Sequence, residues 1–220
     1  MGQRHSSTSV AWAGIAITGV DLSASMLAVC RDKLAAESEQ VQSQVRLVAA
    51  DTRRLDLGET YSLAVIPFRP FQHLLTVDDQ LTCLHSIHRH LRPGGTLVFD
   101  LFNPSLQMLV DETHTSEWGD EPEFTTPAGE RVRRRFRVAR RDWLHQIQDL
   151  EMISYVTSPD GSTRRDVERF QMRHLFRYEV EHLLVRAGFE NVHVYSDFGG
   201  TPFGTKYPGE LVIVASRSTT

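Results

Sequence analysis

The chain of 220 residues has only two cysteines and no long apolar run. Cys30 and Cys83 lie on two predicted helices, without CxxC spacing or a nearby set of His and Cys ligands, so we expect reduced packing residues and no metal site. No stretch approaches the roughly 18 apolar residues of a membrane span, and no charged N-terminal segment leads into an apolar run. We therefore expect a cytoplasmic protein without a membrane partner.

The chain also lacks a strong excess of charge, because its formal net charge is −4. Residues 131–141 are nevertheless locally basic. Alternate positions of a predicted strand carry two kinds of side chain: Arg131, Arg133, Arg135 and Arg137 on one face, and Val132, Phe136 and Val138 on the other.

Two explanations account for these arginines. In the first, they hold an anionic substrate or RNA. In the second, they form a solvated face and lie across from acidic residues of neighbouring strands, either Asp149 and Glu151 or Glu168. No aromatic residues interleave with the arginines on their face, as stacking on bases would require. We favour the ion pairs and expect no nucleic-acid partner.

The composition is that of an ordinary soluble globular protein, with 40% hydrophobic and 24% charged residues. The length of 220 residues suits a single domain. The first half alternates strand and helix patterns, as in a parallel sheet with helices on both faces. We expect strands over 15–20, 45–50, 61–66 and 95–102, and helices over 23–38 and 78–91. Gly94 and Gly95 supply a tight turn before the last of these strands.

The second half begins with a polar stretch, residues 108–127, that predicts a loop or a flexible lid. Three strands over 130–142, 146–158 and 164–174 follow it. A helix over 177–187 and strands over 191–196 and 210–215 complete the chain.

Asp21 is the most informative residue, because it closes the apolar run from Ile15 to Val20 just before a helix. A carboxylate in this place can accept two hydrogen bonds from the vicinal hydroxyls of a ribose. The alternatives are that Asp21 is the helix N-cap, or that Ser23 is the cap and Asp21 favours the positive helix end. A second acid, Asp51, ends the strand over 45–50 in the same way.

Three segments follow one another in a characteristic order and spacing: Gly19-Val20-Asp21-Leu22-Ser23-Ala24-Ser25-Met26-Leu27, Ala50-Asp51-Thr52, and Leu91-Arg92-Pro93-Gly94-Gly95-Thr96-Leu97-Val98-Phe99-Asp100. Together they resemble the class I methyltransferases that use S-adenosylmethionine. The resemblance implies a Rossmann-like α/β sheet with helices on both faces, an antiparallel C-terminal edge and an inserted small antiparallel sheet. Residues 1–107 would be the cofactor-binding half, 108–174 the lid, and 175–220 the C-terminal helix and edge strands.

The resemblance also assigns roles to residues. Asp21 would bind the ribose, Asp51 with Thr52 would contact the adenine amino group, and Leu22 and Met26 would pack on the purine. The expected cofactor-binding residues are Gly2, Asp21, Leu22, Ser23, Met26, Asp51, Thr52, Pro67 and Phe68.

One feature departs from the family, which opens with a strand and a Gly-rich turn that holds the methionine end of the cofactor. This sequence begins Met1-Gly2-Gln3-Arg4-His5, and Gly2 falls near the last part of that turn. We expect the first strand and most of the turn to be missing, truncated or replaced, which would weaken stability and cofactor affinity. Alternatively, a partner chain or a rearranged edge fills the gap.

The acceptor site is expected around the loop 67–73, since ligands of open α/β folds bind beyond the carboxyl ends of strands. Phe68 and Phe71 can face the sulfonium through a cation–π contact, although one of them is expected in the core. Arg69 or His73 can orient the acceptor, and His73 can serve as a base for an oxygen nucleophile. The alternative is that His73 only caps or packs. Further residues expected to line the acceptor site are Asn103, Tyr155 and Arg173.

We therefore predict S-adenosylmethionine-dependent methyl transfer to a nitrogen or oxygen of a small molecule. A nicotinamide-dependent dehydrogenase would need a G-x-G-x-x-G turn and leaves Asp51-Thr52 unexplained. The alternative from another class is a degenerate methyltransferase-like protein that only binds a partner. The sequence leaves the acceptor and the oligomeric state open.

Overall fold

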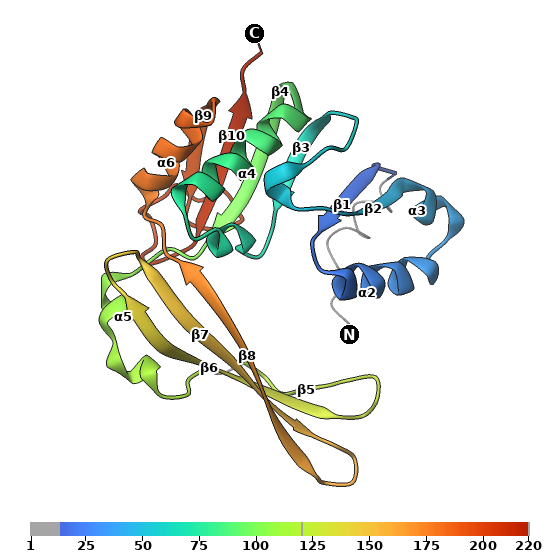
Figure 1. Ribbon diagram of the computed structural model, residues 1–220, viewed down its shortest axis with the longest axis vertical. Helices are drawn as coiled ribbons and strands as arrows, with labels where there is room; N and C mark the ends of the chain where they lie inside the picture. The colour runs from blue at the N-terminus through green and yellow to red at the C-terminus, as the bar shows by residue number, and fades with distance from the viewer. Residues whose placement is uncertain (1–13, 120, 220) are drawn as a thin grey trace. The chain divides into compact units, whose positions relative to one another are not determined.

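The computed structural model describes residues 14–119 and 121–219, which form two compact units (Figure 1). The first unit contains the described residues up to Thr60 together with Thr82–His90. The second contains Tyr61–Leu81 and the described residues from Leu91 onward. Gly2 lies outside the described residues.

The first unit is built around two parallel strands, β1 (Ile17–Asp21) and β2 (Val45–Ala49), with Ile17 opposite Val45 and Asp21 opposite Ala49. The helices α2 (Ala24–Ala35) and α3 (Glu39–Gln44) connect them, and the short helix η1 (Thr52–Arg54) follows β2. The helix expected over 23–38 is confirmed by α2, which ends three residues earlier than expected. α3 was not expected; it begins after Ser38, whose side chain accepts the Val41 N–H as its N-cap.

The second unit contains a four-stranded sheet in the order β3-β4-β10-β9. Its strands are β3 (Tyr61–Ile66), β4 (Leu91–Leu101), β10 (Leu211–Arg217) and β9 (Phe189–Tyr195). β3 and β4 are parallel, and β10 runs antiparallel to both β4 and β9. The central strands carry the core, with Leu97, Phe99, Leu101, Leu211 and Ile213 fully buried. Of the described strands, β1 pairs with β2 alone and β3 pairs with β4 alone.

Two helices accompany this sheet in the sequence. α4 (Val77–His90) begins in the second unit and ends in the first, and α6 (Arg177–Arg186) precedes β9. The short helix η2 (Pro70–His73) lies between β3 and α4.

β4 begins four residues earlier than the strand expected over 95–102. Tyr61 pairs with Leu91 and Leu63 pairs with Thr96, so residues 92–95 form a bulge in the parallel ladder. Gly94 has a φ of +74°, as its predicted turn requires. Gly95 is needed for space, since a Cβ there would lie 2.8 Å from the Arg92 carbonyl oxygen.

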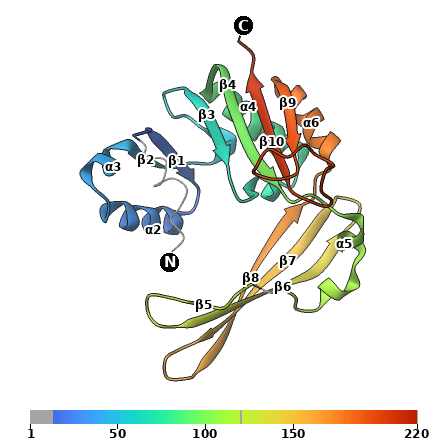
Figure 2. The same cartoon turned by 180° about the vertical axis from the view of Figure 1, so that it is seen from behind.

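A second, antiparallel sheet has the order β5-β6-β7-β8, and Figure 2 shows its three long strands side by side. The strands are β5 (Phe124–Thr125), β6 (Arg131–Asp142), β7 (Ile147–Thr157) and β8 (Thr163–Arg173). The polar stretch before β6 is not simply a loop, because α5 (Leu106–Val110), η3 (Glu112–Thr115) and β5 fall in or next to it.

Of the four arginines expected to face acids on the neighbouring strand, Arg137 does so; Arg131 pairs with Glu123 instead, and Arg140, which was not among the four, pairs with Asp149. Arg137 pairs with Glu151 and Arg140 with Asp149, each at 2.6 Å. Glu168 is not a partner of these arginines, since it stands opposite Met152 in the register, on the other face.

Within residues 14–119 and 121–219, no helix is long and apolar enough to cross a membrane. In the same residues, His, Cys, Asp and Glu side chains do not gather in groups of three that could hold a metal ion.

Candidate functional site

The first unit holds Asp21 at the carboxyl end of β1. Its Oδ1 accepts the Ser23 N–H at 2.7 Å, while the Ser23 Oγ accepts the Met26 N–H at 3.3 Å. Ser23 is thus the N-cap of α2, and the alternative that Asp21 is the cap is wrong. Among the described residues, no hydrogen bond reaches Oδ2 of Asp21, so this oxygen can accept a ligand hydroxyl.

An apolar surface lies next to this carboxylate in the sequence. Leu22 is 72% exposed, Met26 is 51% exposed, and Val29 is exposed as well. Met26 and Val29, three residues apart, lie on one face of α2, and Leu22 directly precedes the N-cap of this helix. A carboxylate acceptor beside exposed apolar side chains fits the two parts of a nucleoside, the ribose and the purine.

Asp51 reaches the same end of the two-stranded sheet. β1 and β2 are parallel, Ala49 stands opposite Asp21, and Asp51 follows two residues later. Arg53 holds its carboxylate, with Nη2 at 2.6 Å from Oδ2 and Nε at 3.0 Å from both oxygens. These hydrogen bonds lower the pKa of Asp51 to about 2. An adenine amino group would therefore have to share Asp51 with Arg53, a residue that the motif did not reveal.

Thr52 contacts the thiol of Cys83 through its side chain. Burial raises the pKa of the Cys83 thiol to about 11, so the group is neutral at physiological pH. Cys30 and Cys83 are both free thiols.

In the second unit, the loop between β3 and η2 has an uncommon backbone. Phe68 and Arg69 are consecutive non-glycine residues with φ values of 67° and 64°. The left-handed conformation costs about 1–2 kcal/mol per residue. It leaves Phe68 85% exposed, directly after the exposed Pro67.

Arg69 holds this loop through two carboxylates. Its Nη2 lies 3.0 and 2.8 Å from the two oxygens of Glu210, and its Nε lies 3.6 Å from Oδ2 of the buried Asp100. The guanidinium also lies over the ring of Phe102, at 5.5 Å from its centroid. Glu210 and Asp100 are distant in the sequence, which carried no signal for this clamp.

Phe71 is a core residue, contrary to the expectation that it lines the acceptor site. It is only 2% exposed and packs on Phe99 at 5.3 Å between ring centroids. Of the two aromatic residues in this loop, Phe68 is the one available to a ligand.

His73 is oriented by β8. Its Nδ1 lies 2.9 Å from the Gln171 carbonyl oxygen, and its ring meets Phe170 at 5.7 Å. Since a carbonyl only accepts, Nδ1 carries the proton and Nε2 of the neutral ring is left as a proton acceptor. The ring of His73 is thus oriented by β8 and exposed.

Gln72 and Arg173 join η2 to β8. The buried Gln72 donates to the Arg173 carbonyl at 3.0 Å and accepts the Phe102 N–H at 2.7 Å. The Arg173 guanidinium donates to the Leu75 carbonyl and to Oε1 of Gln146, both at 3.3 Å. Arg173 is thus largely engaged within the protein, and Gln72 is a positioning residue that the sequence did not indicate.

Asn103 and Tyr155 are also engaged. Asn103 was expected to face the cleft, but it is 7% exposed and its amide donates to the Pro208 carbonyl. The Tyr155 hydroxyl donates to Glu117 at 2.9 Å, and Arg133 lies over its ring at 5.4 Å. Their predicted contact with an acceptor stays a prediction.

The alternation of strands and helices, the antiparallel C-terminal edge and the inserted sheet define the class I methyltransferase fold, as the sequence predicted. Residues 2–95 match the family described as "Methyltransferase domain". The chain thus has the fold of the class I methyltransferases, and somewhat less than half of it matches a methyltransferase domain.

Individual proteins are similar to the chain to different extents. The carboxy-S-adenosyl-L-methionine synthase of Shewanella loihica (strain ATCC BAA-1088 / PV-4) is 30% identical over 105 residues, which span 46% of this chain and 41% of that protein. The chain therefore matches about two fifths of the length of this curated relative.

Solved structures extend the likeness over nearly the whole chain. The CcbJ methyltransferase from Streptomyces caelestis is 27% identical with a TM-score of 0.73, covering 96% of this chain and 78% of that one. The S-adenosylmethionine-bound CalS10 from Micromonospora echinaspora, an amino pentose methyltransferase, is 24% identical with a TM-score of 0.68, covering 92% and 74%.

Proposed function

We propose that the chain transfers the methyl group of S-adenosylmethionine to a nitrogen or oxygen of a small molecule in the cytoplasm. The observation that carries the proposal is the carboxylate of Asp21, whose Oδ2 has no hydrogen-bond partner among the described residues and which adjoins the exposed Leu22 and Met26 in the sequence. The matched methyltransferase domain includes these residues. The two free thiols suit a reducing compartment.

S-adenosylmethionine supplies a methyl carbon activated by positive sulfur. The protein then has to align the nucleophile in line with the carbon–sulfur bond and exclude water. Asp21 would hold the ribose hydroxyls, and the exposed ring of Phe68 offers its face to a cation. An amine needs only to arrive deprotonated, whereas an alcohol or phenol would transfer its proton to Nε2 of His73.

Cofactor binding tests this proposal against a non-catalytic interaction protein. Calorimetric titration of the chain with S-adenosylmethionine should give micromolar affinity. Asp21→Ala should weaken it at least about tenfold, because charge-assisted hydrogen bonds to the ribose are lost. Asp32→Ala, which removes an exposed carboxylate of α2, is the matched control and should leave the affinity unchanged.

Methyl transfer is then measured with radiolabelled cofactor and a panel of small amines and phenols. His73→Gln should lower the rate for phenols and spare that for amines. A chain that binds no cofactor, or an Asp21→Ala variant that binds as well as the wild type, would refute the ribose assignment.

A further inference from the structure

A charged residue interrupts the apolar face of β6. Arg134 lies between Val132 and Phe136 on this face, whereas Arg133 and Arg135 belong to the other. The guanidinium of Arg134 lies over the ring of Phe124 at 5.0 Å, and its Nε is buried. Within residues 14–119 and 121–219, Arg134 forms no ion pair, and Nε has no hydrogen-bond partner.

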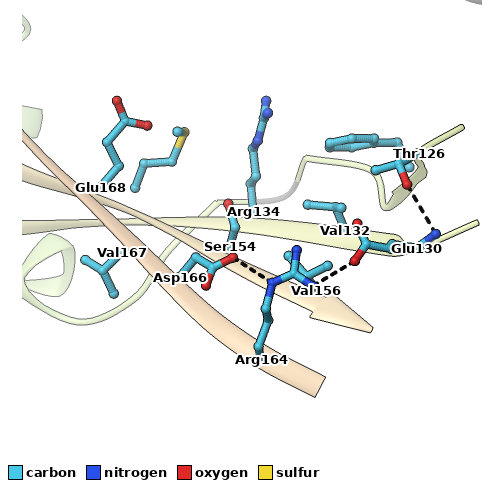
Figure 3. A pocket seen from close by; sticks show the side chains of 12 residues that line it. Thr126, Glu130, Val132, Arg134, Ser154, Val156, Arg164, Asp166, Val167 and Glu168 are labelled. Carbon is cyan, nitrogen blue, oxygen red and sulfur yellow. Dashed lines mark hydrogen bonds and ion pairs between the residues drawn. The ribbon is translucent and has the colours of Figure 1, made fainter. Parts of the chain in front are cut away.

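Arg134 borders a hollow in the antiparallel sheet, with a volume of about 400 Å³ (Figure 3). Its apolar lining includes Val132 of β6, Met152 and Val156 of β7, and Phe124 of β5. Seven of the 12 residues that line it are polar or charged, among them Arg134, Arg164 and Glu168. A hollow of this volume has room for a small molecule.

The charged residues of this hollow fall into two groups. Arg164 joins Glu130 at 2.7 Å and Asp166 at 3.1 Å, and the three form a connected group of ion pairs. Glu168 of β8, like Arg134, has no ion pair or hydrogen bond in the described part of the chain. Figure 3 shows Arg134 and Glu168 rising from the same side of the sheet.

Their separation follows from the register. Arg134 stands opposite Ser154, and Glu168 stands opposite Met152, two residues along β7 and one strand further. Strand spacing and rise place their Cα atoms about 12 Å apart. A cationic and an anionic residue whose Cα atoms are this far apart, with Met152 on the strand between them, suit a ligand whose two charges are separated by an apolar stretch.

We propose that this hollow binds an elongated zwitterion, with its carboxylate on Arg134, its ammonium group on Glu168 and its apolar stretch on Met152 and its neighbours. The residues that line this hollow include neither Asp21 nor any residue of the loop 67–73, to which His73 belongs. It is a binding site additional to the proposed methyl-transfer site.

The probe is 6-aminohexanoate, titrated into the full chain and followed by two-dimensional NMR and calorimetry. Saturable binding at submillimolar concentration is expected, with chemical shift changes at residues of β6, β7 and β8. Arg134→Met and Glu168→Gln should each weaken binding at least about tenfold, since each removes a charge-assisted hydrogen bond. Hexanoate and hexylamine, which each lack one charge, should bind correspondingly less well.

Two variants serve as controls. Arg133→Met removes an arginine from the opposite face of β6, and Glu121→Gln removes an exposed carboxylate before β5; both should bind the probe as the wild type does. Thermal unfolding of all four variants verifies that they fold.

Absence of saturable binding at millimolar probe would overturn the proposal. The proposal would also be overturned if Arg134→Met bound 6-aminohexanoate as tightly as the wild type does, or if the wild type bound hexylamine as tightly as 6-aminohexanoate. If the wild type does not bind the probe and Arg134→Met changes the oligomeric state measured by sedimentation, the hollow is a contact surface between copies of the chain and the proposal is overturned.

Discussion

Asp51 shows how one neighbour sets the properties of a candidate ligand. Its carboxylate is held by the side chain and backbone N–H of Arg53, two positions further along η1. The side-chain hydrogen bond is the largest cause of the low pKa, which falls from an ordinary value of 3.8 to about 2. The ionised form is therefore favoured by folding.

This pairing has a consequence for acid stability. A folded-state pKa below the unfolded value gives stabilisation that is fully present above the unfolded pKa of 3.8 and is lost as the pH falls through about 2. Arg53→Gln should raise the pKa of Asp51 toward 3.8 and shift the acid loss of stability to higher pH. NMR titration of the Asp51 carboxyl carbon measures the first effect, and denaturant unfolding at several pH values measures the second. An unchanged titration would show that Arg53 does not hold the carboxylate in solution.

The sequence was sufficient to place Asp21 at the end of β1, but it was insufficient to place Phe71 in the core or to reveal the contact of Arg53 with Asp51. An acid that ends an apolar strand is a local pattern, and its place at the sheet edge follows from the strand itself. Whether Phe68 or Phe71 enters the core depends on two left-handed residues and on Glu210, which is far away in the sequence. The hold of Arg53 on Asp51 depends on the rotamer of a flexible side chain, which a motif does not specify.

Among the elements, the loop from Pro67 to η2 combines backbone strain with a charged clamp. The ion pairs of Arg69 offset the conformational cost, and the result is an aromatic side chain, Phe68, kept out of the core. Strained backbone held by surrounding contacts is common where a protein positions a ligand. We therefore expect Arg69 to hold this loop in position.

Glu210→Gln should release this loop without removing any group that is predicted to touch the cofactor. We expect the methyl-transfer rate to fall about tenfold to a hundredfold, because small displacements of positioning groups have effects of this size. The affinity for S-adenosylmethionine should change far less. Steady-state kinetics and calorimetry separate the two, with Glu190→Gln on the exposed face of β9 as control. A fall in affinity equal to the fall in rate would contradict a positioning role.

The bulge at residues 92–95 depends on Gly95. A methyl group there would meet backbone on three sides: the Arg92 carbonyl oxygen at 2.8 Å, the Tyr61 carbonyl oxygen at 3.1 Å and the Arg92 nitrogen at 3.2 Å. Gly95→Ala should lower the free energy of unfolding by about 1–3 kcal/mol, a typical effect of overpacking. Gly199→Ala, whose Cβ would meet only the side chain of Asp197, should be nearly neutral. Thermal melts of both variants decide the matter, and equal melting temperatures would refute the steric explanation.

Strongly periodic elements were predicted well and their boundaries less so. β6, β7 and β8 follow from period-two alternation and turn residues, which are local. α3 and β5 were missed because they are short, and the early start of β4 depends on its pairing with Tyr61. The boundaries of β4 and β5 are set by the strands that pair with them, and the sequence of one segment alone does not specify its pairing strand.

At the scale of the whole molecule, charge is neutralised locally. The chain carries a net charge of −4, and arginines of β6 are bound to Glu151, Asp149 and Glu112. Polyanion binding needs phosphate contacts that release counterions, and arginines already bound to carboxylates release few.

We therefore expect the protein to pass a heparin column without retention at physiological salt. It should likewise give no anisotropy change with a fluorescent single-stranded RNA. Glu151→Gln, which frees Arg137 and Arg169 from their common partner, should increase retention at low salt. Retention of the wild-type protein at physiological salt would mean that the arginine face is a nucleic-acid surface after all.

The alternation of β6 bears finally on which insertions and deletions the chain tolerates. One extra residue between Val132 and Arg134 would send every later side chain of the strand to the wrong face, placing arginines among apolar neighbours. In the pairing of β6 with β7, the register shifts only between Val138 and Arg140. Length variation should therefore accumulate in the turn between β7 and β8, around Asp160 and Gly161, where an added residue leaves the register intact.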